Sequence, residues 1–315
     1  MLGRTAEDLF WLSRYIERAE NMARIVEVAY RIGLMPQQGE GRYEEWRSAL
    51  ISTGCESGYL EKYEEVRADR VIDYLLFESA NPSSVQSCLD AARRNGRAQR
   101  TALTHDMWES LNTTWIEFGA LGRQRRASSE LLESVAWIKQ RSALFRGALS
   151  GTSLRNDTWN FSRLGAFVER ADNTARILDV KYFVLLPVPE QSDAATHERQ
   201  WSAILRSASA LRSYHWVYRD AVKPWRVAEL LILNGQVPRS LAFSYERLVA
   251  TLGEISGEYG VRHPAGAAAR ATADLLIQRS ISDIFQEGLH EFLLDFRDRN
   301  ARLARQIGRD FHFQS

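Results

Sequence analysis

Two short stretches of the chain carry the same pattern of acidic, amide and basic residues. Residues 15–28 read YIERAENMARIVEV and residues 167–180 read FVERADNTARILDV, and the two align without a gap. In the first stretch Glu17, Asn21 and Arg24 are spaced i, i+4 and i+7. On a helix this spacing places them on one face. The second stretch repeats the spacing with Glu169, Asn173 and Arg176.

This face allows two interpretations. Glu17 could pair with Arg176 and Glu169 with Arg24, forming a buried two-fold lock that specifies how two helices dock more than it stabilises them. Alternatively, the carboxylates and guanidiniums could line a polar site for an anionic or amino-acid-like ligand. The candidate catalytic residues are Glu17 and Glu169. The candidate substrate-binding or interface residues here are Arg18, Asn21, Arg24, Arg170, Asn173 and Arg176.

A second basic row lies in the segment CLDAARRNGRAQR. Arg93, Arg97 and Arg100 are again spaced i, i+4 and i+7, with Asn95 between them. Three guanidiniums on one helical face repel one another unless carboxylates, phosphate or a partner protein neutralise them. The matching segment of the second half, SYERLVATLGEI, has no such row, so its role is asymmetric.

Other kinds of chemistry are poorly supported. Glu287 and His290 have the spacing found in di-iron carboxylate bundles, but such sites need this motif twice together with two further carboxylates. The corresponding position in the first half has Asn112 instead of histidine. The chain also lacks the motifs of phosphate loops, nucleophile elbows and zinc proteases. We therefore expect no metal and no resident cofactor.

The elements that carry these residues are predicted to be helices. Leu9, Leu12, Ile16, Ala19 and Ala23 advance by three or four positions, as in an amphipathic helix. Few turn signals and no sustained alternation of β-branched residues argue against a sheet. We expect an all-α bundle with helices near 5–33, 43–55, 67–78, 83–103, 106–121, 128–148, 157–186, 196–220, 225–233, 239–256 and 268–308.

The matched stretches belong to a longer internal repeat. RVIDYLLFESANPSS at 70–84 faces RVAELLILNGQVPRS at 226–240, with Pro82 opposite Pro238. Self-similarity at a fixed offset is typical of a duplicated structural unit. We predict a first helical repeat over 1–150 and a second over 151–315, packed together as one compact unit.

Composition narrows the class of protein further. The 315 residues include 41 basic and 40 acidic side chains, and all but four of the basic residues are arginine. Arginine is the planar, bidentate partner of carboxylates and phosphates. Two isolated cysteines, an N-terminus unlike a signal peptide and the lack of a long apolar stretch predict a cytoplasmic protein without a membrane span. The net charge of +1 gives no indication of nucleic-acid binding.

Together these motifs resemble the alpha-E family of all-helical bacterial proteins. The resemblance rests on RTAEDLFWLSRYIERAENMAR, RVIDYLLFESANPSSV, ARRNGRAQR with MWESLN, and LGAFVERADNTARILDV. It implies association or fusion with circularly permuted ATP-grasp proteins, often near a transglutaminase-like protein, in systems proposed to form amide bonds. ATP and magnesium would then bind the partner ligase. Two departures are Arg94, where an acid is expected, and Ala166, which leaves Arg14 without a counterpart.

Three functional hypotheses follow. The first is a partner subunit of an ATP-grasp amide-ligase system, which binds the ligase and a peptide, amino-acid or carboxylate substrate through a Glu/Arg-lined site at the repeat interface. The second is an enzyme that uses Glu17 or Glu169 as a general base for amide-bond formation. The third is a purely structural scaffold.

Overall fold

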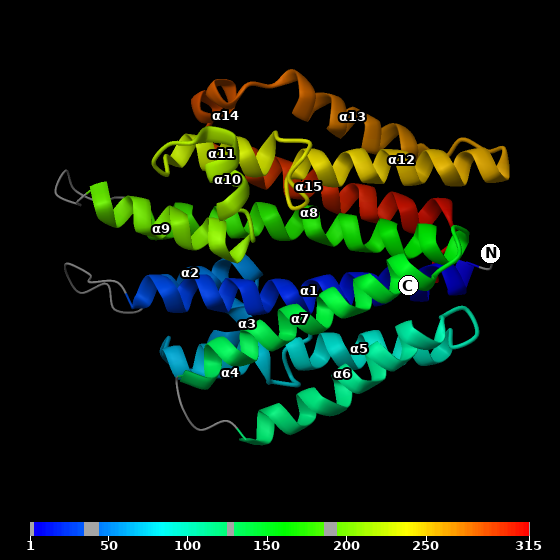
Figure 1. Cartoon of the computed structure of the whole chain (residues 1–315), viewed down its shortest axis with the longest axis horizontal. Coiled ribbons are helices and arrows are strands. Elements are labelled where there is room, and N and C mark those ends of the chain that lie inside the picture. Colours follow the sequence, from blue (N-terminus) through cyan, green and yellow to red (C-terminus); the bar gives the residue numbers. More distant parts are fainter. Residues whose placement is uncertain (1–2, 35–43, 125–128, 186–193, 315) are drawn as a thin grey trace.

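The described residues of the computed structural model, 3–34, 44–124, 129–185 and 194–314, form fifteen helices and no strand, so the all-α prediction is confirmed (Figure 1). The helices of the first part are α1 (Gly3–Gly33), α2 (Glu44–Thr53), α3 (Glu56–Leu60), α4 (Ala68–Leu76), α5 (Val85–Ala98), α6 (His105–Gln124) and α7 (Ser129–Thr152). Those of the second part are α8 (Asp157–Leu185), α9 (Ala194–Ser207), α10 (Leu211–Tyr218), α11 (Pro224–Ile232), α12 (Leu241–Tyr259), α13 (Pro264–Gln278), α14 (Ile281–Glu287) and α15 (Leu289–Asp310).

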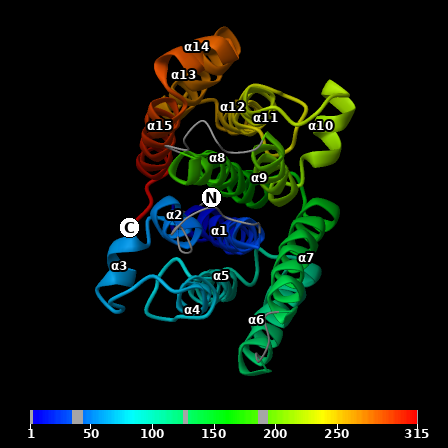
Figure 2. The same cartoon turned by 90° about the vertical axis from the view of Figure 1, so that its left-hand side faces the viewer.

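Helices α1 and α8 form the centre of the bundle and lie side by side along most of their length (Figures 1 and 2). Gly165 permits their close approach, because a Cβ atom at this position would lie 2.0 Å from the carbonyl oxygen of Phe10. A larger residue would force the two backbones apart. The matched stretches, 15–28 and 167–180, begin a few residues beyond this contact on the two helices.

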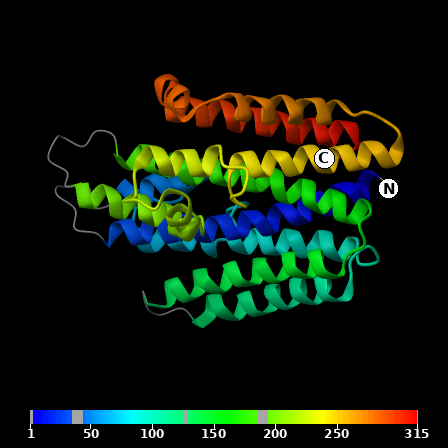
Figure 3. The same cartoon turned by 45° about the horizontal axis from the view of Figure 1, so that its top comes forward.

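The helices that pack on this central pair come from both parts of the chain. Helices α5 and α7 pack on α1, whereas α12 and α15 pack on α8 (Figures 2 and 3). Helix α2 also packs on α8, and α9 also packs on α1. Each long central helix is therefore covered by elements from both parts of the chain.

Helix boundaries follow local sequence signals. Ser84, Ser240 and Ser280 each accept a hydrogen bond from a backbone N–H in the first turn of the following helix. Serine is favoured at this position because its oxygen satisfies an otherwise unpaired donor. Gly54 and Gly260 adopt positive φ angles of 72° and 66° just after helices end, a conformation that glycine tolerates without steric cost.

Two long helices expected from the periodicity are interrupted. The segment 196–220 breaks at Ser209, whose φ angle is 55°, and the segment 268–308 breaks at Ser280 and again at Gly288, whose φ angle is 105°. Buried apolar residues lie on both sides of each break, such as Leu205 and Tyr214 around Ser209, so apolar spacing alone does not show where one helix ends and the next begins. None of the described helices combines the length and the apolar run that a bilayer span requires.

Candidate functional site

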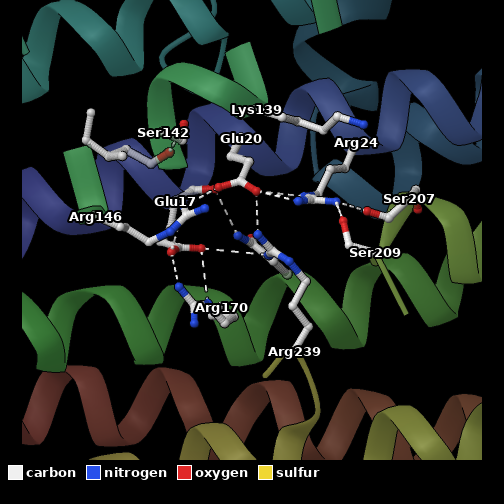
Figure 4. Close-up of polar contacts among 12 residues, drawn as sticks. Glu17, Glu20, Arg24, Lys139, Ser142, Arg146, Arg170, Ser207, Ser209 and Arg239 are labelled. Atoms are coloured by element: carbon white, nitrogen blue, oxygen red, sulfur yellow. Dashed lines mark hydrogen bonds and ion pairs between the residues drawn. The ribbon is translucent and has the colours of Figure 1, made fainter. Parts of the chain in front are cut away.

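Glu17 and Glu20 of α1 lie at the centre of a cluster of guanidiniums (Figure 4). Arg170 of α8 binds both oxygens of Glu17, and Arg146 of α7 bridges Glu17 and Glu20. Arg239 and Arg24 both donate to Oε1 of Glu20. We define these residues as the Glu17 cluster: Glu17, Glu20, Arg24, Arg146, Arg170 and Arg239.

Both carboxylates of the Glu17 cluster are almost completely buried, at 1% exposure for Glu17 and 0% for Glu20. Burial alone would raise their pKa values, but the guanidiniums of Arg170 and Arg146 hold the pKa of Glu17 below its usual range. Arg239, Arg146 and Arg24 act in the same way on the pKa of Glu20. Both groups are therefore ionised and weakly basic.

Glu169 of α8 occupies the reciprocal position against α1. Arg14 donates from Nε to Oε2 at 2.8 Å, and Arg18 donates from Nε to Oε1 at 2.6 Å and from Nη2 to Oε2 at 3.1 Å. Burial would raise the pKa of Glu169, but Arg18 and Arg14 lower it to about 2. We define Glu169, Arg14 and Arg18 as the Glu169 cluster.

The predicted partners within the lock were wrong. Glu17 pairs with Arg170 rather than Arg176, and Glu169 pairs with Arg18 rather than Arg24. Two helices that cross at close range bring equivalent positions opposite each other, so each Glu meets the arginine directly following the other Glu. A residue seven positions further on lies two turns away along the helix.

Arg24 and Arg176 instead bind within their own helices and reach the ends of other helices. Arg24 pairs with Glu20, and Arg176 pairs with Asp172 at 2.6 Å, both at i, i+4. Arg24 also donates to the carbonyl oxygen of Ser207, the last residue of α9. Arg176 donates to the carbonyl oxygen of Ser52, in the last turn of α2, at 2.6 Å. Cations are favoured at helix C-termini because the carbonyl groups there are unpaired.

The asparagines of the two matched stretches, Asn21 and Asn173, differ in their hydrogen bonds. Asn173 donates from Nδ2 to the carbonyl oxygen of Glu17 at 3.2 Å. Asn21 is buried, and neither polar atom of its side chain has a hydrogen-bond partner among the described residues. An unpaired buried amide is costly, so of the two asparagines only Asn173 adds a hydrogen bond between α1 and α8 among the described residues.

Helices α7 and α15 add further charged pairs on the outer sides of α1 and α8. Lys139 binds Glu27 at 2.7 Å, and His290 lies 2.7 Å from Asp179. Arg297 lies 3.6 Å from the second oxygen of Asp179. His290 therefore contacts a carboxylate of α8 through its Nδ1 atom. Among the described residues, no group of three or more His, Cys, Asp or Glu side chains is arranged to hold a metal ion.

The basic row lies apart from these carboxylates, beside α6. The prediction of one helix carrying all three arginines is wrong for Arg100, because α5 ends at Ala98 and Arg100 lies in the turn that follows. Arg93 donates from Nε to Oδ1 of Asn112 at 2.9 Å and stacks 4.2 Å from the ring centroid of Trp115. Arg100 lies 5.5 Å from the ring centroid of Trp108, and Arg97 is exposed. Within the described chain none of the three forms an ion pair. We call Arg93, Arg97 and Arg100 the arginine row.

Sequence reasoning missed three arginines that bind the central carboxylates. Arg14 was noted only for its missing counterpart, and Arg146 and Arg239 were not considered. Arg239 lies in the segment before α12, where no helical periodicity indicates which way a side chain points. Arg146 could have been found, because Lys139 and Arg146 stand seven positions apart, as do Glu20 and Glu27.

Comparison with known proteins gives a family but no established activity. Residues 1–312 match Alpha-E, described as a predicted alpha-helical domain with a conserved ER motif. Similar curated proteins include uncharacterized proteins of Mycobacterium bovis and of two strains of Mycobacterium tuberculosis, each 25% identical over 281 residues. The alignments cover 83% of this chain and 31% of each relative, so the chain spans about a third of the length of these relatives. No solved structure matches it significantly.

Glu-Arg pairs occur at the centre of the fold, at Glu17-Arg18 and Glu169-Arg170, where all four side chains form the ion pairs between α1 and α8. This agrees with a family described by its ER motif. Since the match extends over nearly the whole chain, the protein belongs to the Alpha-E family.

Proposed function

We propose that this chain is a non-catalytic partner of an ATP-grasp amide ligase. It binds the ligase and presents a peptide or carboxylate substrate to it. The observation that carries the non-catalytic role is the state of Glu17 and Glu169. Both are buried, bound by guanidiniums and have lowered pKa values. A general base at neutral pH needs a pKa near the working pH, so this environment disfavours direct catalysis by either carboxylate.

The ligase itself is inferred from the family resemblance. The curated relatives are about three times longer than their matched segments, which supports a role as one module of a larger assembly. In this role the chain binds no nucleotide of its own, and ATP and magnesium act on the partner. The absence of lysine-rich or nucleic-acid-binding motifs and the two isolated, buried cysteines are compatible with the proposed cytoplasmic location.

We further propose that the chain arose from a duplicated helical unit. Several pairs of contacts support this. Arg146 of α7 binds α1, and Arg297 of α15 binds α8. Seven positions earlier, Lys139 and His290 contact the same two helices, so these contacts pair His290 with Lys139 rather than with Asn112. Tyr59 and Tyr214 each accept a backbone N–H and donate to a carbonyl in the loop after α3 or α10. In an experimental structure, α1 with α7 should superpose on α8 with α15.

The arginine row is the proposed docking site for the ligase. Its three guanidiniums form no ion pair within the described chain, and Trp115 and Trp108 provide flat apolar surface beside Arg93 and Arg100. Arginine and aromatic side chains are enriched at protein interfaces, where they contribute a large part of the affinity. The partner surface would be acidic.

Co-purification tests this proposal. The chain and the circularly permuted ATP-grasp protein of the same genome are co-expressed with a tag on one of them. We expect a stable complex that the R97E/R100E variant weakens at least tenfold, because both guanidiniums are exposed and their reversal should leave the fold intact. R270E, on α13 in the other part of the chain, is the matched control. Absence of a complex with the wild-type chain, or equal loss with R270E, would contradict the proposal.

A further inference from the structure

Arg14 lies at the edge of a pocket as well as in the Glu169 cluster. The pocket has a volume of about 470 Å³ and is formed by the N-terminal part of α1, the C-terminal part of α15 and Phe313. This volume lies within the range of small-molecule sites, which is about 300–1,000 Å³. We call it the Arg14 pocket.

One wall of the pocket is aromatic. The rings of Phe10 and Phe313 have centroids 5.4 Å apart, and Trp11 lies beside them on α1. The guanidinium of Arg14 stacks on Trp11, with its central carbon 4.4 Å from the ring centroid. The pocket can therefore receive a flat or branched apolar group next to a positive charge.

The opposite wall combines small residues with two further arginines. Ala301, Ala304 and Gly308 of α15 leave the space open, and Arg305 and Arg309 lie one turn apart on the same helix. Neither Arg305 nor Arg309 forms an ion pair with a described residue, and both are exposed. Like charges at i, i+4 repel each other, so an anion bound between them would relieve this repulsion.

Arg14 has donors left for such an anion. Its Nε is used by Glu169, but the structure gives its Nη atoms no hydrogen-bond acceptor among the described residues. A carboxylate matches a guanidinium in a planar, bidentate pair. Three arginines and an aromatic wall thus present one charged and one apolar surface to the same ligand.

We propose that the Arg14 pocket binds a carboxylate joined to an apolar group, such as the C-terminal residue of a peptide that ends in an aromatic or aliphatic side chain. The carboxylate lies among Arg14, Arg305 and Arg309, and the side chain lies against Trp11 and Phe313. This inference rests on the proposed function, because it names the class of substrate that the chain would present to the ligase.

Binding of three probes to the full chain tests the proposal without the ligase. The probes are N-acetyl-L-phenylalanine, its uncharged C-terminal amide and inorganic phosphate, followed through the indole N–H resonance of Trp11 and by calorimetry. A fragment of this size is expected to bind with a Kd of roughly 0.1–1 mM. The amide and phosphate should each bind at least tenfold more weakly, because each lacks one of the two recognised groups.

Variants locate the site. R305Q/R309Q should weaken binding of the acid at least tenfold, whereas R302Q, an exposed arginine of the same helix that does not line the pocket, should change it less than twofold. A301W keeps every charge and fills the pocket from an exposed position, so it should also abolish binding.

Equal affinity for the acid and its amide would overturn the proposal, as would equal affinity for phosphate, unaltered binding by R305Q/R309Q, or no binding of the acid. Because these measurements do not involve a ligase, the pocket proposal can fail while co-purification succeeds, and the reverse also holds.

Discussion

The Glu17 and Glu169 clusters occupy reciprocal positions between α1 and α8, yet they are built differently. In the Glu17 cluster two carboxylates bind guanidiniums from α1, α7, α8 and the segment before α12. In the Glu169 cluster one carboxylate binds two arginines that both come from α1. The first cluster therefore joins four parts of the chain, and the second joins two helices.

The second acid of each matched stretch is also more exposed beside the Glu169 cluster than in the Glu17 cluster. Asp172, which stands one turn from Glu169, is 19% exposed, whereas Glu20 is fully buried. The arginines of the two clusters do not differ in this way, since Arg14 and Arg18 are 14% and 22% exposed and Arg146 of the Glu17 cluster is 26% exposed. Arg14, however, borders a pocket. The Glu17 cluster thus ties more of the chain to its acids, whereas the Glu169 cluster places one guanidinium at the edge of a pocket.

The largest expected effect comes from neutralising Glu20. Glu20→Gln should lower the free energy of unfolding by about 3–5 kcal/mol, because Arg24, Arg146 and Arg239 would lose the fully buried carboxylate that they share. Urea unfolding at pH 7 measures this loss. Glu64→Gln, at an exposed acid, should have an effect within about 0.5 kcal/mol. A Glu20→Gln variant as stable as the control would show that the Glu17 cluster does not hold the fold.

A smaller effect, with a defined pH dependence, is expected for Glu169. The pKa of Glu169 is about 2 in the folded protein, whereas the usual value for a glutamate, which applies in the unfolded chain, is 4.5. Its stabilising contribution is therefore complete above pH 4.5 and is lost as the pH falls toward 2, because the unfolded chain takes up the proton first. Glu169→Gln should cost about 3 kcal/mol at pH 7, the lower end of the range for a broken buried ion pair. The cost is smaller than for Glu20→Gln because Glu169 binds two guanidiniums and Glu20 binds three.

Urea unfolding of the wild type and Glu169→Gln at several pH values between 7 and 2 measures this dependence. Stability of the variant should fall less steeply below pH 4.5 than that of the wild type. Parallel curves would mean that Glu169 does not contribute to the acid sensitivity of the protein. If Glu169→Gln lost more stability at pH 7 than Glu20→Gln, the Glu169 cluster would be the more important of the two for stability.

The smallest effects are expected for the two asparagines, which form a matched pair. Asn173→Leu should cost about 1 kcal/mol, because it removes the hydrogen bond to the carbonyl oxygen of Glu17. Asn21→Leu should be neutral or slightly stabilising, since it replaces a buried amide that has no partner among the described residues. Thermal unfolding of both variants side by side tests this. If Asn21→Leu costs as much as Asn173→Leu, then Asn21 has a bonding role that the structure does not contain.

The sequence predicted the long central helices well and their partners poorly. Residues 5–33 and 157–186 were expected to be helical, and the helices run over Gly3–Gly33 and Asp157–Leu185, because apolar spacing and turn residues are local signals. Spacing also shows which residues share a face, as for Glu17, Asn21 and Arg24. It cannot show which residue lies opposite, because this depends on where two helices cross.

Here Gly165 sets the crossing point, and a glycine within a helical pattern gives no indication of its neighbour. The same reason explains Arg239, which reaches Glu20 from a position 219 residues away in a segment without periodicity. The Glu20–Arg24 and Asp172–Arg176 pairs, by contrast, follow directly from the i, i+4 rule. Local pairs were predictable, and pairs between distant elements required the fold.

The hydrogen bond from Arg176 to the carbonyl oxygen of Ser52 can form only late in synthesis on the ribosome. The last turn of α2 is completed by a guanidinium that lies 124 positions later in the chain. During translation α2 therefore emerges well before the residue that binds its final carbonyl, and it must wait for α8. Chain growth proceeds at about 5–20 residues per second, so roughly 6–25 s pass between the synthesis of Ser52 and that of Arg176, and the last turn of α2 gains this partner only once α8 has been made.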